Sequence, residues 1–72
     1  MKVSELKEGE FAITANRFAV LGLSPRSFGS KYAGTANVVH IANGVGAFAK
    51  SDECRKVSAA EAFKVALEYI EQ

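Results

Sequence analysis

Residues 58–72 read SAAEAFKVALEYIEQ, and this stretch decides the fold. Ser58 followed three residues later by Glu61 is a capping box, in which each side chain accepts a hydrogen bond from a backbone N–H at the start of a helix. The pattern therefore predicts a helix that begins at Ala59. Its predicted buried stripe, at helical spacing, consists of Phe63, Ala66, Leu67 and Ile70, flanked by Ala59, Ala62, Val65 and Tyr69.

The opposite face of this helix is predicted to be exposed. Lys64, Glu68 and Glu71 face away from the apolar stripe, and Lys64 can pair with Glu68 across one turn. A single helix of about four turns is marginal in water, so its apolar stripe needs a surface on which to pack. The rest of the chain must supply that surface.

The composition predicts one small folded domain that spans residues 1–72. Hydrophobic residues make up 49% of the chain and charged residues 24%, which is typical of a globular protein. The single cysteine, Cys54, cannot form an internal disulfide, and no run is apolar enough for a signal peptide or a membrane span. We therefore expect a soluble cytoplasmic protein with no membrane partner. Because so short a chain buries little core, formation of a homo-oligomer such as a homodimer is an open alternative.

A first β-hairpin is predicted between residues 11 and 22, where Phe11–Ala15 and Phe18–Gly22 flank Asn16-Arg17. With a two-residue turn, the side chains that share one face of this hairpin are Phe11, Ile13, Ala15, Phe18 and Val20. A longer loop around Asn16 is the alternative, because arginine adopts a left-handed backbone less readily than glycine.

A second hairpin is predicted around Asn43-Gly44, the dipeptide that favours a type I′ turn. Its strands are Asn37–Ala42 and Val45–Lys50. In this register Val39 lies opposite Phe48, and Ile41 lies opposite Gly46. Residues 51–57 then connect the hairpin to the helix, with a short extended piece at residues 55–57.

These elements predict an α+β fold. Two β-hairpins form a four-stranded antiparallel sheet, and the C-terminal helix packs on one face of it. The side chains predicted on that face are Phe11, Ile13, Phe18, Val20, Val39, Ile41 and Phe48. The alternative is a small SH3-like barrel capped by the helix, because both faces of the strands carry apolar residues.

Residues 1–10 are predicted to begin with a short helical turn that places Val3 and Leu6 under the sheet, followed by a turn at residues 7–10. The opening VSELKEGEF, residues 3–11, precedes the hairpin at Asn16-Arg17. It resembles the start of short, uncharacterised phage-encoded β-rich accessory proteins, in which a Leu-Lys-x-Gly-acid-x-Phe-like phrase precedes a strand, although Phe11 comes one position earlier here. The resemblance carries no catalytic residue and implies a small accessory protein that acts by binding.

The sequence offers no predicted catalytic, metal or cofactor site. Cys54 and His40 are single residues of their kind, with no evident partner to orient them as nucleophile and base. Structural zinc needs about four such ligands, and the glycines of residues 44–46 are not followed by the helix that a phosphate loop requires. The paired carboxylates lie in polar turns, where solvation is their usual state: Glu8 with Glu10, and Asp52 with Glu53. We therefore expect a protein that is not an enzyme.

The candidate partner-binding residues lie in the loop 24–35, which holds two cations and two aromatic rings: Arg26, Phe28, Lys31 and Tyr32. Such a set suits stacking on bases, contact with phosphates or anchoring in a protein groove. The alternative is that the two rings cover the open face of the sheet. Residues 11–50 contain no acidic side chain, and three further members of this region are secondary candidates: Arg17, His40 and Lys50.

The predicted function is that of a non-catalytic accessory protein acting through protein–protein interaction, as an inhibitor or modulator of its partner. One alternative is a nucleic-acid-binding module that uses the basic and aromatic loop. It ranks second because few cations are available to neutralise phosphates. Another alternative is a self-assembling structural subunit, whose stability would depend on its concentration.

Overall fold

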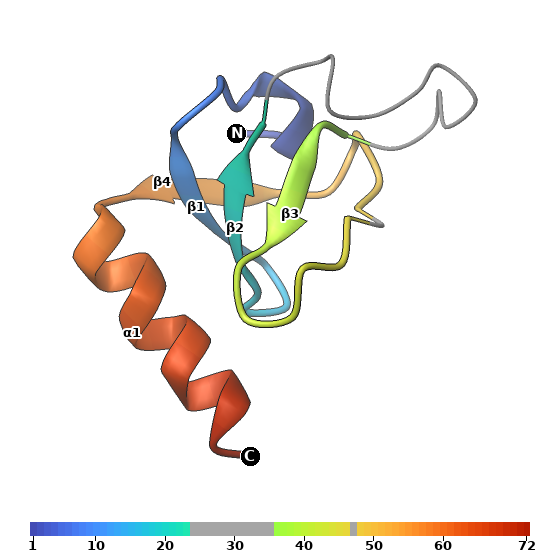
Figure 1. Cartoon of the computed structure of the whole chain (residues 1–72). Coiled ribbons are helices and arrows are strands. Elements are labelled where there is room, and N and C mark those ends of the chain that lie inside the picture. Colours follow the sequence, from blue (N-terminus) through green and yellow to red (C-terminus); the bar gives the residue numbers. More distant parts are fainter. Residues whose placement is uncertain (24–35, 47) are drawn as a thin grey trace.

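The computed structural model describes residues 1–23, 36–46 and 48–72. Its elements, in chain order, are a 3-10 helix η1 (Val3–Glu5), strands β1 (Phe11–Thr14), β2 (Ala19–Gly22), β3 (Val38–His40) and β4 (Cys54–Val57), and helix α1 (Ala59–Ile70). The strands form one antiparallel sheet in the order β3-β2-β1-β4, and α1 packs on β1 and β2 (Figure 1). The predicted α+β class is confirmed. The sheet is open, with β3 and β4 at opposite edges, so the barrel alternative is wrong.

The β1–β2 hairpin has a loop one residue longer than the predicted turn. The amide of Thr14 donates to the carbonyl of Phe18 at 2.9 Å, which leaves residues 15–17 as the loop. The Phe18 amide also donates to the Thr14 hydroxyl at 3.1 Å, and Arg17 closes the loop with a φ of 62°. The two-residue turn is therefore wrong, and the longer-loop alternative is confirmed.

This extra residue changes the face on which each side chain lies. Ile13 pairs with Ala19, and Ala12 pairs with Val20. Because side chains alternate along a strand, a shift of one residue moves a set of side chains to the other face of the sheet. The predicted single core face is therefore divided between two layers.

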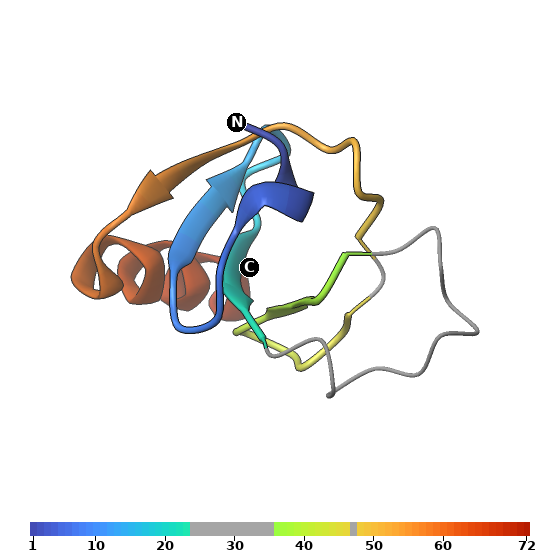
Figure 2. The same cartoon turned by 90° about the horizontal axis from the view of Figure 1, so that it is seen from above.

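Helix α1 covers one face of the sheet (Figure 2). One layer of core side chains lies under α1, and the other lies on the opposite face of the sheet. The layer under α1 contains Ile13, Ala19, Ala62, Val65 and Ala66, with Phe11, Ile41, Ala42 and Val57 at its margin. The opposite layer contains Val3, Ala12, Val20, Ala36, Val38, Phe48 and Cys54, with Leu6 and Phe18 at its margin. The predicted core face is thus wrong for Phe18, Val20 and Phe48, which lie in the second layer.

The second hairpin does not form as predicted. The amides of Ala36 and His40 donate to the carbonyls of Phe48 and Val45, each at 2.8 Å, so the returning chain runs beside β3 in a different register. No described residue of the predicted strand 45–50 belongs to a named strand. The reason lies in the turn: a type I′ turn needs positive φ at both central residues, and of the pair only Gly44 has it, at 76°.

The fourth strand is β4, within the predicted connector 51–57. It pairs along the whole of β1, from Phe11 opposite Val57 to Thr14 opposite Cys54. This position satisfies the backbone groups of β1 that β2 leaves free. The predicted extended piece at residues 55–57 is therefore part of β4.

The opening residues behave as predicted. Val3, in η1, is fully buried, and Leu6 packs against the same core layer. The amide of Val3 donates to the carbonyl of Asp52 at 2.8 Å, which ties η1 to the segment before β4. The turn at residues 7–10 passes so close to β2 that a Cβ on Gly22 would lie 2.2 Å from the Lys7 carbonyl oxygen. Gly22 is therefore required by close backbone approach.

Helix α1 begins at Ala59, as predicted, and the Ser58 hydroxyl accepts a hydrogen bond from the Glu61 amide at 3.2 Å. The face that it buries was predicted wrongly. Ala62, Val65 and Ala66 are buried on the sheet, whereas three members of the predicted buried stripe are more than half exposed: Phe63 (52%), Leu67 (57%) and Ile70 (59%).

Candidate interaction surface

The four primary site candidates, Arg26, Phe28, Lys31 and Tyr32, lie outside the described residues. The three secondary candidates occupy different settings. Arg17 lies in the β1–β2 loop and forms an ion pair, His40 is buried at the end of β3 with 3% exposure, and Lys50 is exposed in the segment before β4. The predicted basic surface is therefore not formed by these three side chains.

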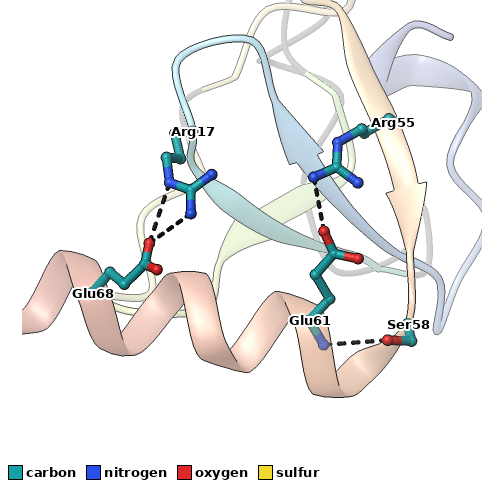
Figure 3. A network of polar contacts seen from close by, with 5 residues as sticks. All are labelled: Arg17, Arg55, Ser58, Glu61 and Glu68. Atoms are coloured by element: carbon teal, nitrogen blue, oxygen red, sulfur yellow. Dashed lines mark hydrogen bonds and ion pairs between the residues drawn. The ribbon is translucent and has the colours of Figure 1, made fainter.

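Two ion pairs join α1 to the β1–β2 loop and to β4 (Figure 3). The Nε and Nη2 atoms of Arg17 both donate to one carboxylate oxygen of Glu68, at 3.2 and 2.8 Å. The Nη2 atom of Arg55, on β4, donates to Glu61 at 2.7 Å, so the Glu61 carboxylate pairs with Arg55 in place of the predicted capping bond. Glu68 likewise pairs with Arg17 and not with Lys64.

These pairs contribute orientation more than stability. Their side chains are 44–61% exposed, and exposed ion pairs stabilise a protein by only about 0.2–1 kcal/mol each. They nevertheless hold Glu61 against β4 and Glu68 against the β1–β2 loop. Both residues lie on one side of α1, and in this orientation the small residues of the helix meet the sheet while its large apolar residues face outward.

The outward residues form a continuous surface, which we call the α1 stripe: Ala60, Phe63, Leu67 and Ile70. All four are exposed. Elsewhere in the described part of the chain the exposed large hydrophobic residues are Met1 (41%) and Val45 (50%). The α1 stripe is thus the place where such side chains gather on one element.

The stripe is continuous with the core at one end and bordered by charge on one side. The ring of Phe63 contacts that of Phe11, with centroids 5.6 Å apart, so Phe63 is held in place although it is half exposed. Lys64 and Glu71, both exposed, follow Phe63 and Ile70 directly in the sequence and line the same border. An apolar centre with a charged rim is the usual anatomy of a protein interface.

His40 occupies an aromatic cluster that the sequence did not indicate. Its ring lies 4.6 Å from Tyr69, 5.1 Å from Phe18 and 6.2 Å from Phe48, measured between centroids. Its Nε2 atom is buried and has no hydrogen-bond partner among the described residues. The ring of His40 is therefore packed among aromatic rings and not exposed to solvent.

A hollow of about 420 Å³ lies between the β1–β2 loop and β4 and is lined by Ile13, Thr14, Ala15, Arg17, Glu53, Cys54 and Arg55. Burial raises the pKa of the Cys54 thiol. The thiolate, which is the reactive form, is therefore scarce at neutral pH. Both arginines already pair with carboxylates of α1, so the hollow presents neither an activated nucleophile nor a free cationic site.

Two further properties of the described residues bear on function. They contain no group of three or more His, Cys, Asp or Glu side chains that could hold a metal ion. Within the same residues, no helix has the length and apolar character needed to cross a membrane.

Comparison with known protein families, curated proteins and solved structures gives no match. The geometry of the described residues is therefore the basis for a functional proposal.

Proposed function

We propose that this chain is a small, non-catalytic protein-binding module and that the α1 stripe is its binding surface. The observation that carries the proposal is the exposure of Phe63, Leu67 and Ile70 by 52–59% on one face of one helix. Hot spots of protein interfaces are large apolar or aromatic side chains clustered in this way.

The fold does not need the stripe for its own core. The face of the sheet under α1 is filled by Ala62, Val65 and Ala66, and the opposite face is covered by η1 and Phe48. The three large side chains therefore remain in water at a cost that a partner would remove. Each exposes roughly 100 Å², so burial of about 300 Å² at about 25 cal/mol per Å² makes about 7 kcal/mol available, from which the entropy of association is subtracted.

The charges of the described residues favour a protein over a nucleic acid as partner. Arg17, Arg55 and Lys56 pair with Glu68, Glu61 and Glu10 at 2.7–2.8 Å. Neutralised cations release few counterions from a phosphate backbone, which is the main source of affinity for nucleic acids. The loop set Arg26, Phe28, Lys31 and Tyr32 stays a prediction of a second contact.

The proposal is tested by capture from a lysate of the source cells, with and without nuclease treatment. The bait is the tagged chain, compared with Leu67→Gln/Ile70→Gln, which removes apolar surface from the stripe. The matched control is Val45→Gln, because Val45 is exposed by a similar 50% but lies outside α1. Circular dichroism confirms that each variant folds.

We expect the wild-type chain and the Val45→Gln control to retain the same protein, and the double variant to lose it. Retention by all three baits would show that the stripe is not the binding surface. Loss of every retained protein after nuclease treatment would support the nucleic-acid alternative.

A further inference from the structure

A concave surface lies where the end of β3 meets the last turn of α1. It is a hollow of about 190 Å³, lined by Phe18, His40, Asn43, Val45, Phe48 and Tyr69. Its floor is buried, since His40 is 3% and Phe48 9% exposed, whereas Asn43 and Val45 are exposed at its rim. No member of the α1 stripe lines this hollow, so the two surfaces are separate.

Hydrogen bonds in the turn after β3 hold the rim in place. The amide of His40 donates to the carbonyl of Val45, and the amide of Gly44 donates to the carbonyl of His40, each at 2.8 Å. The amide of Val45 donates to Oδ1 of Asn43 at 3.0 Å, so Val45 contributes to the rim through its backbone. A site that is held in this way loses little conformational freedom when a ligand binds.

The lining of the hollow suits one uncharged aromatic ring. Three of its six side chains are phenyl or phenol rings, and the six include no Asp, Glu, Lys or Arg. The rings of Phe18 and Tyr69 meet that of His40 edge to face, which is a favoured arrangement for aromatic groups. An engineered apolar cavity of about 150 Å³ holds one benzene molecule, so the hollow has the size for a single six-membered ring.

The floor also carries a hydrogen-bonding atom that lacks a partner. Nε2 of His40 is buried and forms no hydrogen bond in the part of the chain that the structure describes. Buried polar atoms nearly always have a partner, and a ligand is one source of it. An imidazole nitrogen donates or accepts according to its tautomer, whereas a phenolic hydroxyl does both and therefore satisfies either tautomer.

We infer that this hollow binds a phenol ring whose hydroxyl bonds to Nε2 of His40. Because the surrounding rings cover Nε2, admission of the hydroxyl requires a movement of Tyr69, which is half-buried in the last turn of α1. A free small phenol and a tyrosine side chain of another protein share this chemistry. The inference concerns a surface apart from the α1 stripe and does not rest on the proposed function.

The test is an NMR titration of the full chain with p-cresol and, as the matched control, with toluene, which has the same ring and methyl group but no hydroxyl. His40 is the only histidine, so its ring nitrogen signals are identified without ambiguity. We expect p-cresol to shift the Nε2 signal with a dissociation constant of about 1 mM, which is typical of so small a ligand. It should bind about fivefold more tightly than toluene, the preference that one hydrogen bond supplies.

The variant His40→Phe keeps a planar ring and removes the nitrogen. It is expected to bind p-cresol and toluene equally. Circular dichroism checks that it folds, and the comparison of the two ligands on the wild-type chain decides the inference without it.

A tripeptide with blocked ends and a central tyrosine distinguishes the two sources of the phenol ring. Binding of the peptide as tight as that of p-cresol supports the site with a tyrosine ligand, and binding of p-cresol alone supports it with a free phenol. Absence of saturable p-cresol binding in the millimolar range overturns the inference, as does equal affinity of the wild-type chain for p-cresol and toluene. Neither result affects the α1 stripe, which the capture assay tests through Leu67 and Ile70.

Discussion

Asparagine substitutions at Ala62 and Leu67 test which face of α1 packs on the sheet. Ala62 is fully buried against Ile13 and Ala19, whereas Leu67 is 57% exposed. Ala62→Asn buries an amide group without a hydrogen-bond partner, which costs about 1–3 kcal/mol. It also forces a larger side chain into a filled layer, which costs a further amount of about 1–3 kcal/mol. The lower helix propensity of asparagine adds about 0.6 kcal/mol. The expected loss of unfolding free energy is therefore about 3–6 kcal/mol, enough to unfold a domain of this size.

Leu67→Asn should cost much less. A fully buried leucine contributes about 2–3 kcal/mol, and less than half of this one is covered, so the loss is about 1–1.5 kcal/mol once helix propensity is included. In a domain of this length that corresponds to a fall in Tm of about 4–12 °C.

The assay is urea denaturation followed by far-ultraviolet circular dichroism. It is performed at low micromolar protein concentration, so that any association through the stripe does not add to the effect of Leu67. If Leu67→Asn proves the more destabilising of the two at the lowest concentration, the assignment of the buried face is refuted, and the α1 stripe is refuted with it.

Three further predictions concern the rest of the fold. Gly22→Ala should destabilise the protein by about 1–3 kcal/mol, because the new Cβ would lie 2.2 Å from the Lys7 carbonyl oxygen; thermal denaturation measures the loss. The pKa of the Cys54 thiol is higher in the folded than in the unfolded protein, so the thiol stabilises the fold below its unfolded pKa of about 8.5. This contribution is lost as the pH rises through the pKa of the folded protein. Cys54→Ser should therefore flatten the decline in stability at alkaline pH. The hydrogen bond from Lys56, at 2.7 Å, lowers the pKa of the Glu10 carboxyl. The carboxylate therefore stabilises the folded protein above about pH 4.3, and this contribution is lost as the pH falls through the pKa of Glu10 in the folded protein. Carbon-detected NMR titration of Lys56→Ala should show the Glu10 pKa returning upward, and an unchanged value would contradict the pairing.

The sequence predicted the features that depend on neighbouring residues. The start of α1 follows from Ser58, the 3-10 turn from the spacing of Val3 and Leu6, and the first hairpin from strands on either side of Asn16. Each signal lies within a few residues, where capping, burial and turn formation act directly. The α+β class followed from the order of these elements.

Features that depend on distant contacts could not be predicted in this way. One extra residue in the β1–β2 loop reversed the faces of Phe18 and Val20. Strand β4 formed where it could pair with β1, forty or more residues earlier in the chain. The sequence left the loop length open between two alternatives. It did not indicate β4, because that pairing depends on an edge of β1 that lies far away in the chain.

The candidate surface was missed for a related reason. Helix α1 has apolar residues on two faces, and periodicity alone favoured the larger side chains as the buried ones. Small side chains on β2, such as Ala19, instead accept a close approach by Ala62 and Ala66. The ion pairs of Arg17 and Arg55 with α1 would have indicated the rotation, but they join residues far apart in the sequence.

The most direct test of the account is a methyl NMR dilution series with a soluble paramagnetic agent, which broadens signals in proportion to solvent access. The account predicts that the Val65 methyls stay protected at every concentration, because this side chain is 4% exposed on the sheet side of α1. The Leu67 and Ile70 methyls should be strongly broadened in dilute protein, because these side chains are 57% and 59% exposed. Leu67 and Ile70 signals that are already protected in the most dilute sample, with Val65 broadened, would contradict the account.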